Sequence, residues 1–555
     1  MLAYADRRPL WMDELMLSLG IVTHSFAGLT RQPLDYGQTA PVLFLWCQRL
    51  AISLAGVSEW TLRALPLAFG LLLLPLLWSA GRRLLGEQAA LLALLLAALS
   101  QPLIYYSSEA KQYAADACFT ALLIHAVTVV LRAPAEARSW RWLAATGVLA
   151  AGFSQPSVFV LFAACVALAF SPPVREAPRW RQRLAAVSTL WAALCALLFA
   201  TVYRAAAASP YMQRVWAAVF LTPTAPDIAE RVHFSVRDVL LQTMLPDWPG
   251  ATPTAFVIGV LGYLAGAAAL WLRRTRDGRA AAALLTLPVA GVFAASALGR
   301  YPIATRLVLF LAPAVYLTYG AAVAALLDAR PVVRTLPAWV RGLTYAAVLA
   351  LLVRWRLDGV LDEARHPRRY EDTRDLIASY SRQASPDPVY IFAGGVPSWA
   401  FYTTDWSSPD TARLTWMARV AGPGGPAFGN RPSRRRRVGR EYDELRYPSR
   451  GHEEIIGTGA GMEWRERANI PDPDPDEGWA ENEARRLYEA VARRADGGRS
   501  AWVYFAHEGG TQRDAVLDAL RQSGTRVDIV RSANGVVLYR ATFPLGRNGT
   551  DSSGR

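Results

Sequence analysis

Lysine and cysteine are scarce in this chain, and an apolar leader is missing. Lys111 is the only lysine among 59 basic residues. The four cysteines lie in apolar stretches and lack C-x-x-C spacing; they are Cys47, Cys118, Cys165 and Cys195. This pattern excludes a disulfide framework and a thiolate metal site. The first ten residues, MLAYADRRPL, contain no apolar core, so a cleaved signal peptide is not expected.

Long apolar runs are abundant before residue 357. The chain of 555 residues is 53% hydrophobic and carries a net charge of +14. A basic chain suggests a nucleic-acid partner, but many of these arginines stand in short clusters between apolar runs, where membrane topology accounts for them. We therefore expect a multi-pass membrane protein with no nucleic-acid partner.

A membrane-crossing helix needs about 20 apolar residues, and the sequence predicts about ten of them. The predicted spans are 61–81, 87–106, 113–131, 142–153, 157–170, 184–205, 253–272, 281–298, 305–327 and 340–356. The apolar stretch 40–56 has Gln48 and Arg49 at its centre, which favours a juxtamembrane or re-entrant position. Small residues in GVLGYLAG (259–266) predict a helix–helix contact.

Arginines gather in alternate loops between the predicted spans. The rich loops contain Arg82, Arg83, Arg132, Arg138, Arg141, Arg175, Arg179, Arg181, Arg183, Arg273, Arg274, Arg276, Arg279, Arg330, Arg334 and Arg341. The opposite loops are nearly bare. The positive-inside rule makes the rich loops cytoplasmic. The segments 1–60, 107–112, 206–252 and 299–304, and everything after 357, are then predicted to lie outside.

Ionisable residues also gather at the predicted external side, at or near span ends. They are Asp13, Glu14, Glu109, Lys111, Asp116, Arg300 and Arg306. Charges at such depths are costly and indicate a functional site. Simpler interpretations remain open: Asp13 is a suitable N-cap for a helix running to about Phe26, and Lys111 and Arg306 could snorkel to the interface.

Several motifs resemble one family in their order along the chain. They are LWMDE (10–14), DYGQTAPVLFLWCQRLAISLAGVSEWTLRALP (35–66), GRRLLGEQAALLALLLAALSQPLIYYSSEAKQYAADACF (81–119) and YPIATRLVLFLAP (301–313). Over roughly residues 7–330 the chain resembles GT-C membrane glycosyltransferases, in the branch of protein O-mannosyltransferases and the lipid A aminoarabinose transferase. The family pattern places a span before the acidic pair, whereas only twelve residues precede Asp13 here. Either the start codon is placed too late in this sequence, or this member lacks that span.

The resemblance implies transfer of a sugar from a polyprenyl-phosphate donor on the outer face of the membrane. By the same resemblance, Asp13 is the general base, and Glu14 orients this base or the acceptor. Lys111 and Arg306 suit binding of the donor phosphate, and Arg300 is a third candidate.

The remaining acids and a metal are less closely specified. Glu109 and Asp116 stand seven residues apart, about two helical turns, and one of them could match a second external acid of some relatives. Some relatives use a divalent metal and others none. Because some relatives use one, a divalent metal is possible here. The sequence itself shows no metal-ligand constellation and no certain cofactor.

The pattern changes after residue 357. Predicted strands at 388–394 and 500–509, with helices between them and a hairpin turn at Asn534–Gly535, indicate a small α/β domain over 357–545. The Gly-, Pro- and Arg-rich stretch near 420–480 is interpreted as a disordered insertion, including RPSRRRR (431–437) and PDPDPDE (471–477), and 546–555 as a disordered tail.

The predicted protein is thus a polytopic α-helical membrane protein of GT-C type with a C-terminal extracytoplasmic α/β domain. Residues 1–356 form the transmembrane catalytic domain, with 1–60 as an external loop bearing juxtamembrane helices. Located in a bacterial inner membrane among its lipids, it would transfer sugar to an envelope glycan, lipid or protein. The alternatives are a polytopic lipid or glycan transporter and a non-catalytic GT-C scaffold.

Overall fold

The structure is a computed structural model of the whole chain. It describes residues 2–31, 34, 38–208, 213, 216–241, 253–273, 275–329, 337–365, 368–382, 387, 389–403, 406, 446–448, 454–457, 479–492, 498–507 and 510–544. The chain divides into two compact units. The helical unit comprises Met1–Arg7 and Ala40–Pro367, and the α/β unit comprises Arg8–Thr39 and Arg368–Arg555. Residues 8–39, which the sequence analysis grouped with the membrane domain, thus belong to the second unit.

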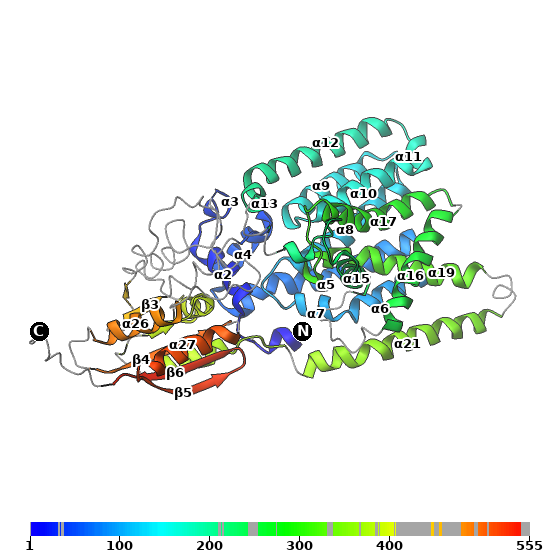
Figure 1. Cartoon of the computed structure of the whole chain (residues 1–555). Coiled ribbons are helices and arrows are strands. Elements are labelled where there is room, and N and C mark those ends of the chain that lie inside the picture. Colours follow the sequence, from blue (N-terminus) through cyan, green and yellow to red (C-terminus); the bar gives the residue numbers. More distant parts are fainter. Residues whose placement is uncertain are drawn as a thin grey trace, which may run out of the picture. The chain divides into compact units, whose positions relative to one another are not determined.

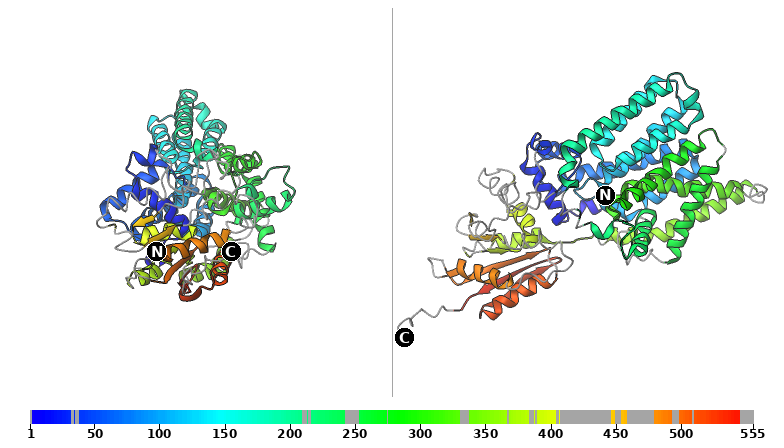
Figure 2. Two further views of the ribbon diagram at one scale, coloured as in Figure 1. Left: turned by 60° about the vertical axis from the view of Figure 1, so that its left-hand side comes forward. Right: turned by 45° about the horizontal axis from the view of Figure 1, so that its top comes forward.

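Helices make up the described part of the helical unit (Figure 1, Figure 2). They are α1 (Leu2–Ala5), α4 (Val42–Ala55), α5 (Glu59–Leu84), α6 (Glu87–Ala98), α7 (Gln101–Tyr106), α8 (Tyr113–Arg132), α9 (Ala137–Phe153), α10 (Ser157–Phe170), α11 (Pro172–Glu176), α12 (Trp180–Leu198), α13 (Arg204–Ala207), α15 (Ile228–Leu241), α16 (Pro253–Leu272), α17 (Gly278–Ala297), α18 (Thr305–Val308), α19 (Ala312–Ala329) and α21 (Ala338–Arg365). A π-helical turn (Phe199–Tyr203) extends α12, and 3₁₀ turns cover Ala217–Val219 and Leu309–Leu311.

Six helical segments of this unit are long and apolar enough to cross a membrane. They are Glu59–Leu84, Tyr113–Arg132, Trp180–Tyr203, Pro253–Leu272, Gly278–Ala297 and Thr305–Leu326. The predicted span 87–106 is divided between α6 and α7. Pro102 explains the division, because its ring fits the first turn of α7 but could not continue α6, where a backbone N–H is needed.

Close helix packing in this unit depends on glycines. A Cβ atom on Gly266 of α16 would lie 2.1 Å from the carbonyl oxygen of Thr318 in α19. A Cβ on Gly320 would lie 2.4 Å from the carbonyl oxygen of Ala89 in α6. The predicted contact at 259–266 is therefore confirmed, with α19 as the partner helix, because only glycine permits this approach.

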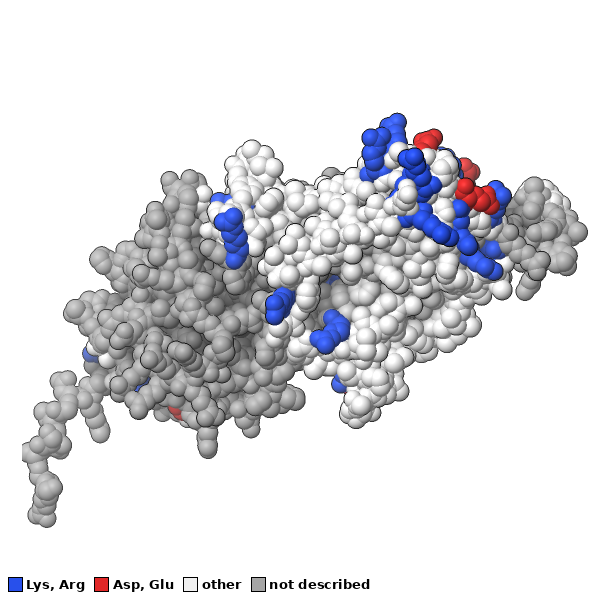
Figure 3. All heavy atoms as spheres, turned by 90° about the horizontal axis from the view of Figure 1, so that it is seen from above, with Lys and Arg blue, Asp and Glu red and all other residues white. Residues whose placement is uncertain are grey.

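One end of the helical unit, here called the arginine end, consists of the turns 82–86, 132–138, 171–183 and 273–279. Side chains join these turns: Arg132 Nη2 to Arg83 O (3.4 Å), Arg183 Nη1 to Pro134 O (3.0 Å) and Ala135 O (2.7 Å), Ser171 Oγ to Asp277 Oδ1 (2.8 Å), and Arg276 Nη2 to Glu176 Oε2 (3.6 Å). Figure 3 shows basic side chains gathered at one end of this unit. The described arginines of four predicted cytoplasmic loops thus share one end.

The other end, here called the lysine end, consists of the turns 107–112, 154–156, 216–227 and 299–308. Contacts that join them or their flanking helices are Leu221 N to Ser296 Oγ (3.1 Å), Ile303 N to Val219 O (3.3 Å), and the Tyr301 ring to the Phe159 ring (5.2 Å). Helix α8 runs from the lysine end to the arginine end, and α17 runs back. Each has 20 residues, which at about 1.5 Å per residue matches the hydrocarbon thickness of about 30 Å.

The α/β unit combines the early segment with the C-terminal part of the chain. Its described elements are α2 (Met12–Thr23), α3 (Gly28–Arg31), α22 (Thr373–Ser381), β1 (Val389–Ile391), α23 (Val396–Thr403), β2 (Arg446–Pro448), β3 (Glu454–Gly457), α26 (Trp479–Ala492), β4 (Ser500–Ala506), α27 (Gly510–Gln522), β5 (Arg526–Ala533) and β6 (Val536–Thr542). A 3₁₀ turn covers Ala393–Gly395.

Six strands form one mixed sheet in the order β2-β3-β1-β4-β6-β5. Strand β1 is parallel to β3 and β4, and the other pairs are antiparallel. Strands β1, β4, β5 and β6 lie at the strands and hairpin predicted from the sequence. Strands β2 and β3 fall within the stretch interpreted as an insertion, most of which lies outside the described residues, as do 431–437, 471–477 and the tail 546–555.

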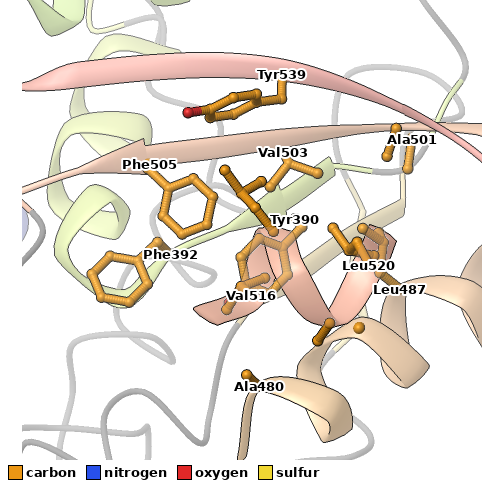
Figure 4. Close-up of a cluster of buried hydrophobic side chains, with 14 of the residues drawn as sticks. Tyr390, Phe392, Ala480, Leu487, Ala501, Val503, Phe505, Val516, Leu520 and Tyr539 are labelled. Atoms are coloured by element: carbon orange, nitrogen blue, oxygen red, sulfur yellow. The ribbon is translucent and has the colours of Figure 1, made fainter. Parts of the chain in front are cut away.

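Alternating residues of β4 pack on the two faces of this sheet. Ala501, Val503 and Phe505 face α26 and α27, in the cluster of Figure 4. Trp502 and Tyr504 face the opposite layer, which contains α22 and α23. This period of two is what a strand buried on both faces requires. Helix α2 packs against α23, on the outer side of that second layer.

Candidate active site

Lys111 lies at the lysine end, in the turn between α7 and α8. Its side chain is enclosed by protein, with 3% of the residue exposed, and the neighbouring Glu109 is fully buried. The turn is fixed by two hydrogen bonds: Ser108 Oγ donates to Tyr105 O (2.8 Å), and Lys111 N donates to Glu109 O (2.7 Å). A buried ammonium group held by a tight turn is a suitable binding group for an anion.

Tyrosines surround this turn. The Tyr106 ring centroid lies 5.0 Å from that of Tyr105 and 5.1 Å from that of Tyr113. Asp116, in the first turn of α8, is 5% exposed. Burial and the nearby charge of Asp116 raise the pKa of Tyr301. Acidic and phenolic groups from α8 and the 299–308 turn are thus neighbours at the lysine end.

Arg306 lies in α18, which packs against α7, the helix that precedes Lys111. Its guanidinium carbon is 5.5 Å from the ring centroid of Trp216, a cation–π arrangement that limits its orientation. Arg300, in the turn after α17, is exposed. Two of the predicted phosphate-binding residues, Lys111 and Arg306, are therefore on adjacent elements of one end, with Arg300 on its surface.

A largely buried acidic side chain contacts the turn that carries Arg306. Asp238 of α15 accepts a hydrogen bond from Thr305 and pairs with Arg237, whose Nη2 lies 3.2 Å from its Oδ1. Burial raises the pKa of Asp238, and these two partners act against the shift. The turn that carries Arg306 is thus hydrogen-bonded to α15.

The acidic pair belongs to the α/β unit. Asp13 lies in the first turn of α2 and is partly exposed, whereas Glu14 is fully buried. One interpretation of the sequence made Asp13 the N-cap of this helix, but the structure shows that it is not. Trp11 is the N-cap because Glu14, three residues later, accepts a hydrogen bond from Trp11 N through Oε2 (3.3 Å). Helix α2 ends at Thr23, before the predicted end near Phe26.

The first turn of α2 gives the two acids different surroundings. Asp13 lies in the first turn of α2, at the positive end of the helix dipole. Glu14 is used in fixing the helix start. Of the pair, Asp13 is the partly exposed residue and Glu14 the buried one.

A metal-binding cluster is not evident in the described ranges. No group of three or more His, Cys, Asp or Glu residues there is arranged to hold a metal ion. The acids at the lysine end, Glu109 and Asp116, do not form such a group with any third described ligand.

Trp216, Thr305 and Asp238 are site residues that the sequence analysis missed. Trp216 contacts Arg306, and Asp238 contacts Thr305, the residue before Arg306, only through contacts between separate elements, so no short motif marks them. The signal that was present is the placement of Trp216 in the polar, aromatic loop 206–252 of the predicted external side.

The comparisons with known proteins give one family match. Residues 39–205 match the family described as dolichyl-phosphate-mannose-protein mannosyltransferase. The match includes Glu109, Lys111 and Asp116, but it includes neither the acidic pair nor Arg300 and Arg306. No curated protein matches the chain.

Solved structures of similar backbone were also found. ArnT from Cupriavidus metallidurans bound to undecaprenyl phosphate is 15% identical, with 97% of this chain and 96% of that chain covered and a TM-score of 0.46. The archaeal oligosaccharyltransferase AglB from Archaeoglobus fulgidus, in complex with an inhibitory peptide and a dolichol-phosphate, is 13% identical, with 96% and 70% covered and a TM-score of 0.45. Over residues 39–205 the family match agrees with the resemblance that the sequence predicted.

Proposed function

We propose that this protein transfers a sugar from a polyprenyl-phosphate donor to an acceptor of the cell envelope. The observation that carries the proposal is the buried Lys111, which lies within the segment that matches a mannosyltransferase family and in the turn that follows α7, the helix against which the Arg306 helix α18 packs. The donor named in that family's description, a dolichyl phosphate sugar, has the chemistry that such a cationic site would recognise.

The cations would act on the leaving group. In a direct displacement, the bond between the anomeric carbon and the phosphate oxygen breaks, and the phosphate leaves with the electron pair. Lys111 and Arg306 stabilise the charge that develops on that phosphate. Arg306 provides a planar fork for phosphate oxygens, and Lys111 a point charge.

The acid would act on the acceptor. Asp13 takes the proton of the acceptor hydroxyl or amine as the new bond to the anomeric carbon forms, which inverts that carbon. Glu14 orients the start of α2, consistent with its burial and its hydrogen bond to Trp11 N. Asp116 or Glu109 is the candidate for a second acid.

The proposed topology places the arginine end in the cytoplasm and the lysine end outside. The support is the excess of arginine at the first end, which favours cytoplasmic retention. By this orientation the reaction occurs at the extracytoplasmic face of a bacterial inner membrane, and the α/β unit is also extracytoplasmic. The acceptor is then an envelope glycan, lipid or protein.

The test is transfer by the full chain and its Asp13→Asn variant, each reconstituted in phospholipid vesicles. The donor is a labelled pool of polyprenyl-phosphate sugars extracted from host membranes, and the acceptor is an unlabelled envelope extract. We expect the variant to lose transfer at least 100-fold, because amide oxygen is a poor base. Asp528→Asn is the matched control, because Asp528 is a surface aspartate of the same unit, paired with Arg526 (2.8 Å).

Two further results would decide between proposals. Excess sugar-free polyprenyl phosphate should compete with the labelled donor, since the proposed cations bind its phosphate. Full activity of Asp13→Asn would remove Asp13 as the base. Label that crosses the vesicle membrane without being transferred would favour a transporter, and absence of both would favour a non-catalytic scaffold.

A further inference from the structure

The segment that leads into α2 is anchored within the α/β unit. Leu10 N donates a hydrogen bond to the Tyr402 hydroxyl of α23 (2.8 Å). Arg8, only 3% exposed, donates from Nη1 to Arg368 O (3.0 Å). Both partners come from the C-terminal part of the chain, so the residues that precede the acidic pair are held by that part.

Trp11 is at the centre of this anchor. Its ring centroid lies 5.0 Å from that of Tyr370 and 6.2 Å from that of His507. Trp11 is also the N-cap of α2, and its N–H bonds to Glu14. The place of the indole ring therefore fixes where the helix that bears Asp13 begins.

A hydrogen bond to Glu371 fixes the ring of His507 beside the indole. His507 Nδ1 lies 2.8 Å from Glu371 Oε1, and Glu371 is 3% exposed. His507 has a φ of +51°, a conformation that side-chain-bearing residues rarely adopt and that persists only where surrounding contacts impose it. These contacts make His507 a fixed partner of Trp11 and not a mobile surface side chain.

The β5–β6 hairpin turn supports the same cluster. Asp372 N donates to Asn534 O (2.9 Å), and the Asn534 side chain donates to Arg369 O. Gly535 has a φ of +66°, and a Cβ atom there would lie 2.2 Å from Tyr370 O. Any side chain at Gly535 would therefore push Tyr370, and with it the partner of Trp11.

The geometry points to a positioning surface for the acidic helix: Tyr370, His507 and Glu371 of the α/β unit seat Trp11 and so set the place of Asp13. The C-terminal unit is then part of the transfer machinery through the helix it holds. This inference rests on the proposed function in giving Asp13 a role in transfer, but the seating itself is measurable without any activity.

Seating matters because a general base must be held within hydrogen-bond reach of its proton. A displacement of about 1 Å at a reacting group can lower the rate by about 100-fold without weakening substrate binding. The positioning surface should therefore affect kcat for transfer and leave the donor concentration for half-maximal rate unchanged.

The experiment compares Trp11→Ala with Trp11→Phe in the full-length protein. Deuterium exchange of the amides in Met12–Thr23 reports the seating, and transfer from the labelled donor pool reports kcat and KM. We expect Trp11→Ala to speed exchange in α2 by about tenfold or more and to lower kcat by about 10- to 100-fold at unchanged KM. Trp11→Phe retains an aromatic ring and should therefore recover most of the slow exchange in α2 and most of the wild-type kcat.

A second pair of variants reaches the surface from the opposite side. Gly535→Ala should reproduce the Trp11→Ala effects, because the new Cβ displaces Tyr370. Gly524→Ala is the matched control: its φ is +79°, and a Cβ there meets only Pro544 Cγ at 3.7 Å. Both variants place alanine at a positive φ, but only the first should speed exchange in α2 and lower kcat.

Three outcomes would overturn the inference. Unchanged exchange in α2 with Trp11→Ala would show that the indole does not seat the helix. Faster exchange with unchanged kcat would show that the seating does not serve transfer. Equal effects of Gly535→Ala and Gly524→Ala would assign them to backbone strain alone. The proposed function fails separately, if Asp13→Asn transfers at the wild-type rate.

Discussion

The two ends of the helical unit hold charge in different ways. At the arginine end, the pair Arg276–Glu176 is 74% and 61% exposed, and most bonds reach backbone carbonyls of neighbouring turns. At the lysine end, Lys111, Glu109 and Asp116 are buried. Exposed charge is inexpensive and suits topology, whereas buried charge is costly and is retained where it serves binding or chemistry. The contrast predicts that equal changes at the two ends have unequal effects.

Removal of the buried ammonium should have the largest effect. Lys111→Met retains the length of the side chain but loses the charge, so we expect transfer to fall by about 100- to 1,000-fold. Lys111→Arg should recover part of it, since a cation is restored in a different shape. The measurement is transfer in vesicles, with elution as a monodisperse protein as the folding check. Near-normal transfer by Lys111→Met would show that the buried charge at the lysine end does not serve transfer.

Changes around Arg306 should have an intermediate effect. Arg306→Gln removes a phosphate partner, and we expect the KM for donor to rise about tenfold. Trp216→Leu retains the charge and removes only the ring beneath it, so a rise of about threefold is expected. Titration of the labelled donor pool measures both. A larger effect of Trp216→Leu than of Arg306→Gln would show that the ring contacts substrate directly.

The pH dependence of stability should reveal the burial of Asp238 at the lysine end. Burial raises the pKa of Asp238 in the folded protein, so its stabilising contribution is complete below the unfolded pKa of about 4 and is lost as pH rises through the folded value. Asp238→Asn lacks this loss. Between pH 4 and 7 the Tm of the variant should therefore fall less than that of the wild type, by about 2 °C. The opposite sign would mean that ionised Asp238 stabilises its turn.

Changes at the arginine end should have the smallest effect. Arg276→Gln breaks the pair with Glu176, which is exposed and worth at most about 1 kcal/mol. We expect transfer within twofold of wild type and Tm within about 1 °C. A substantial loss of transfer would contradict the assignment of this end to topology alone.

Apolar periodicity was enough to place most helices. The predicted spans 253–272 and 157–170 coincide with α16 and α10, because hydrophobic runs and their polar ends are local properties of the chain. The span 87–106 was predicted as one uninterrupted segment although Pro102 was visible, and the structure divides it into α6 and α7, because hydropathy alone does not register a missing N–H. The six described span-length helices are fewer than the ten predicted spans because several predicted spans are shorter helices, such as α9 and α10.

The candidate site was only partly predictable. Lys111, Arg306 and Asp13 stood out as isolated charges near apolar runs, which is a local signal. The partners of Arg306 and Trp11 did not, because contacts such as Leu10 N to Tyr402 join residues 392 positions apart. A single sequence contains no sign of such pairings, so the grouping of residues 8–39 with the C-terminal unit could not be foreseen.

Because the α/β unit is discontinuous in sequence, its first segment is synthesised long before the rest of the unit. The ribosome makes residues 8–39 first and then all of 40–367 before it reaches the strands and helices that residues 8–39 join. At about 5–20 residues per second this wait lasts tens of seconds. A truncated polypeptide released in that interval would carry its acidic helix without the strands and helices that this helix joins in the finished chain.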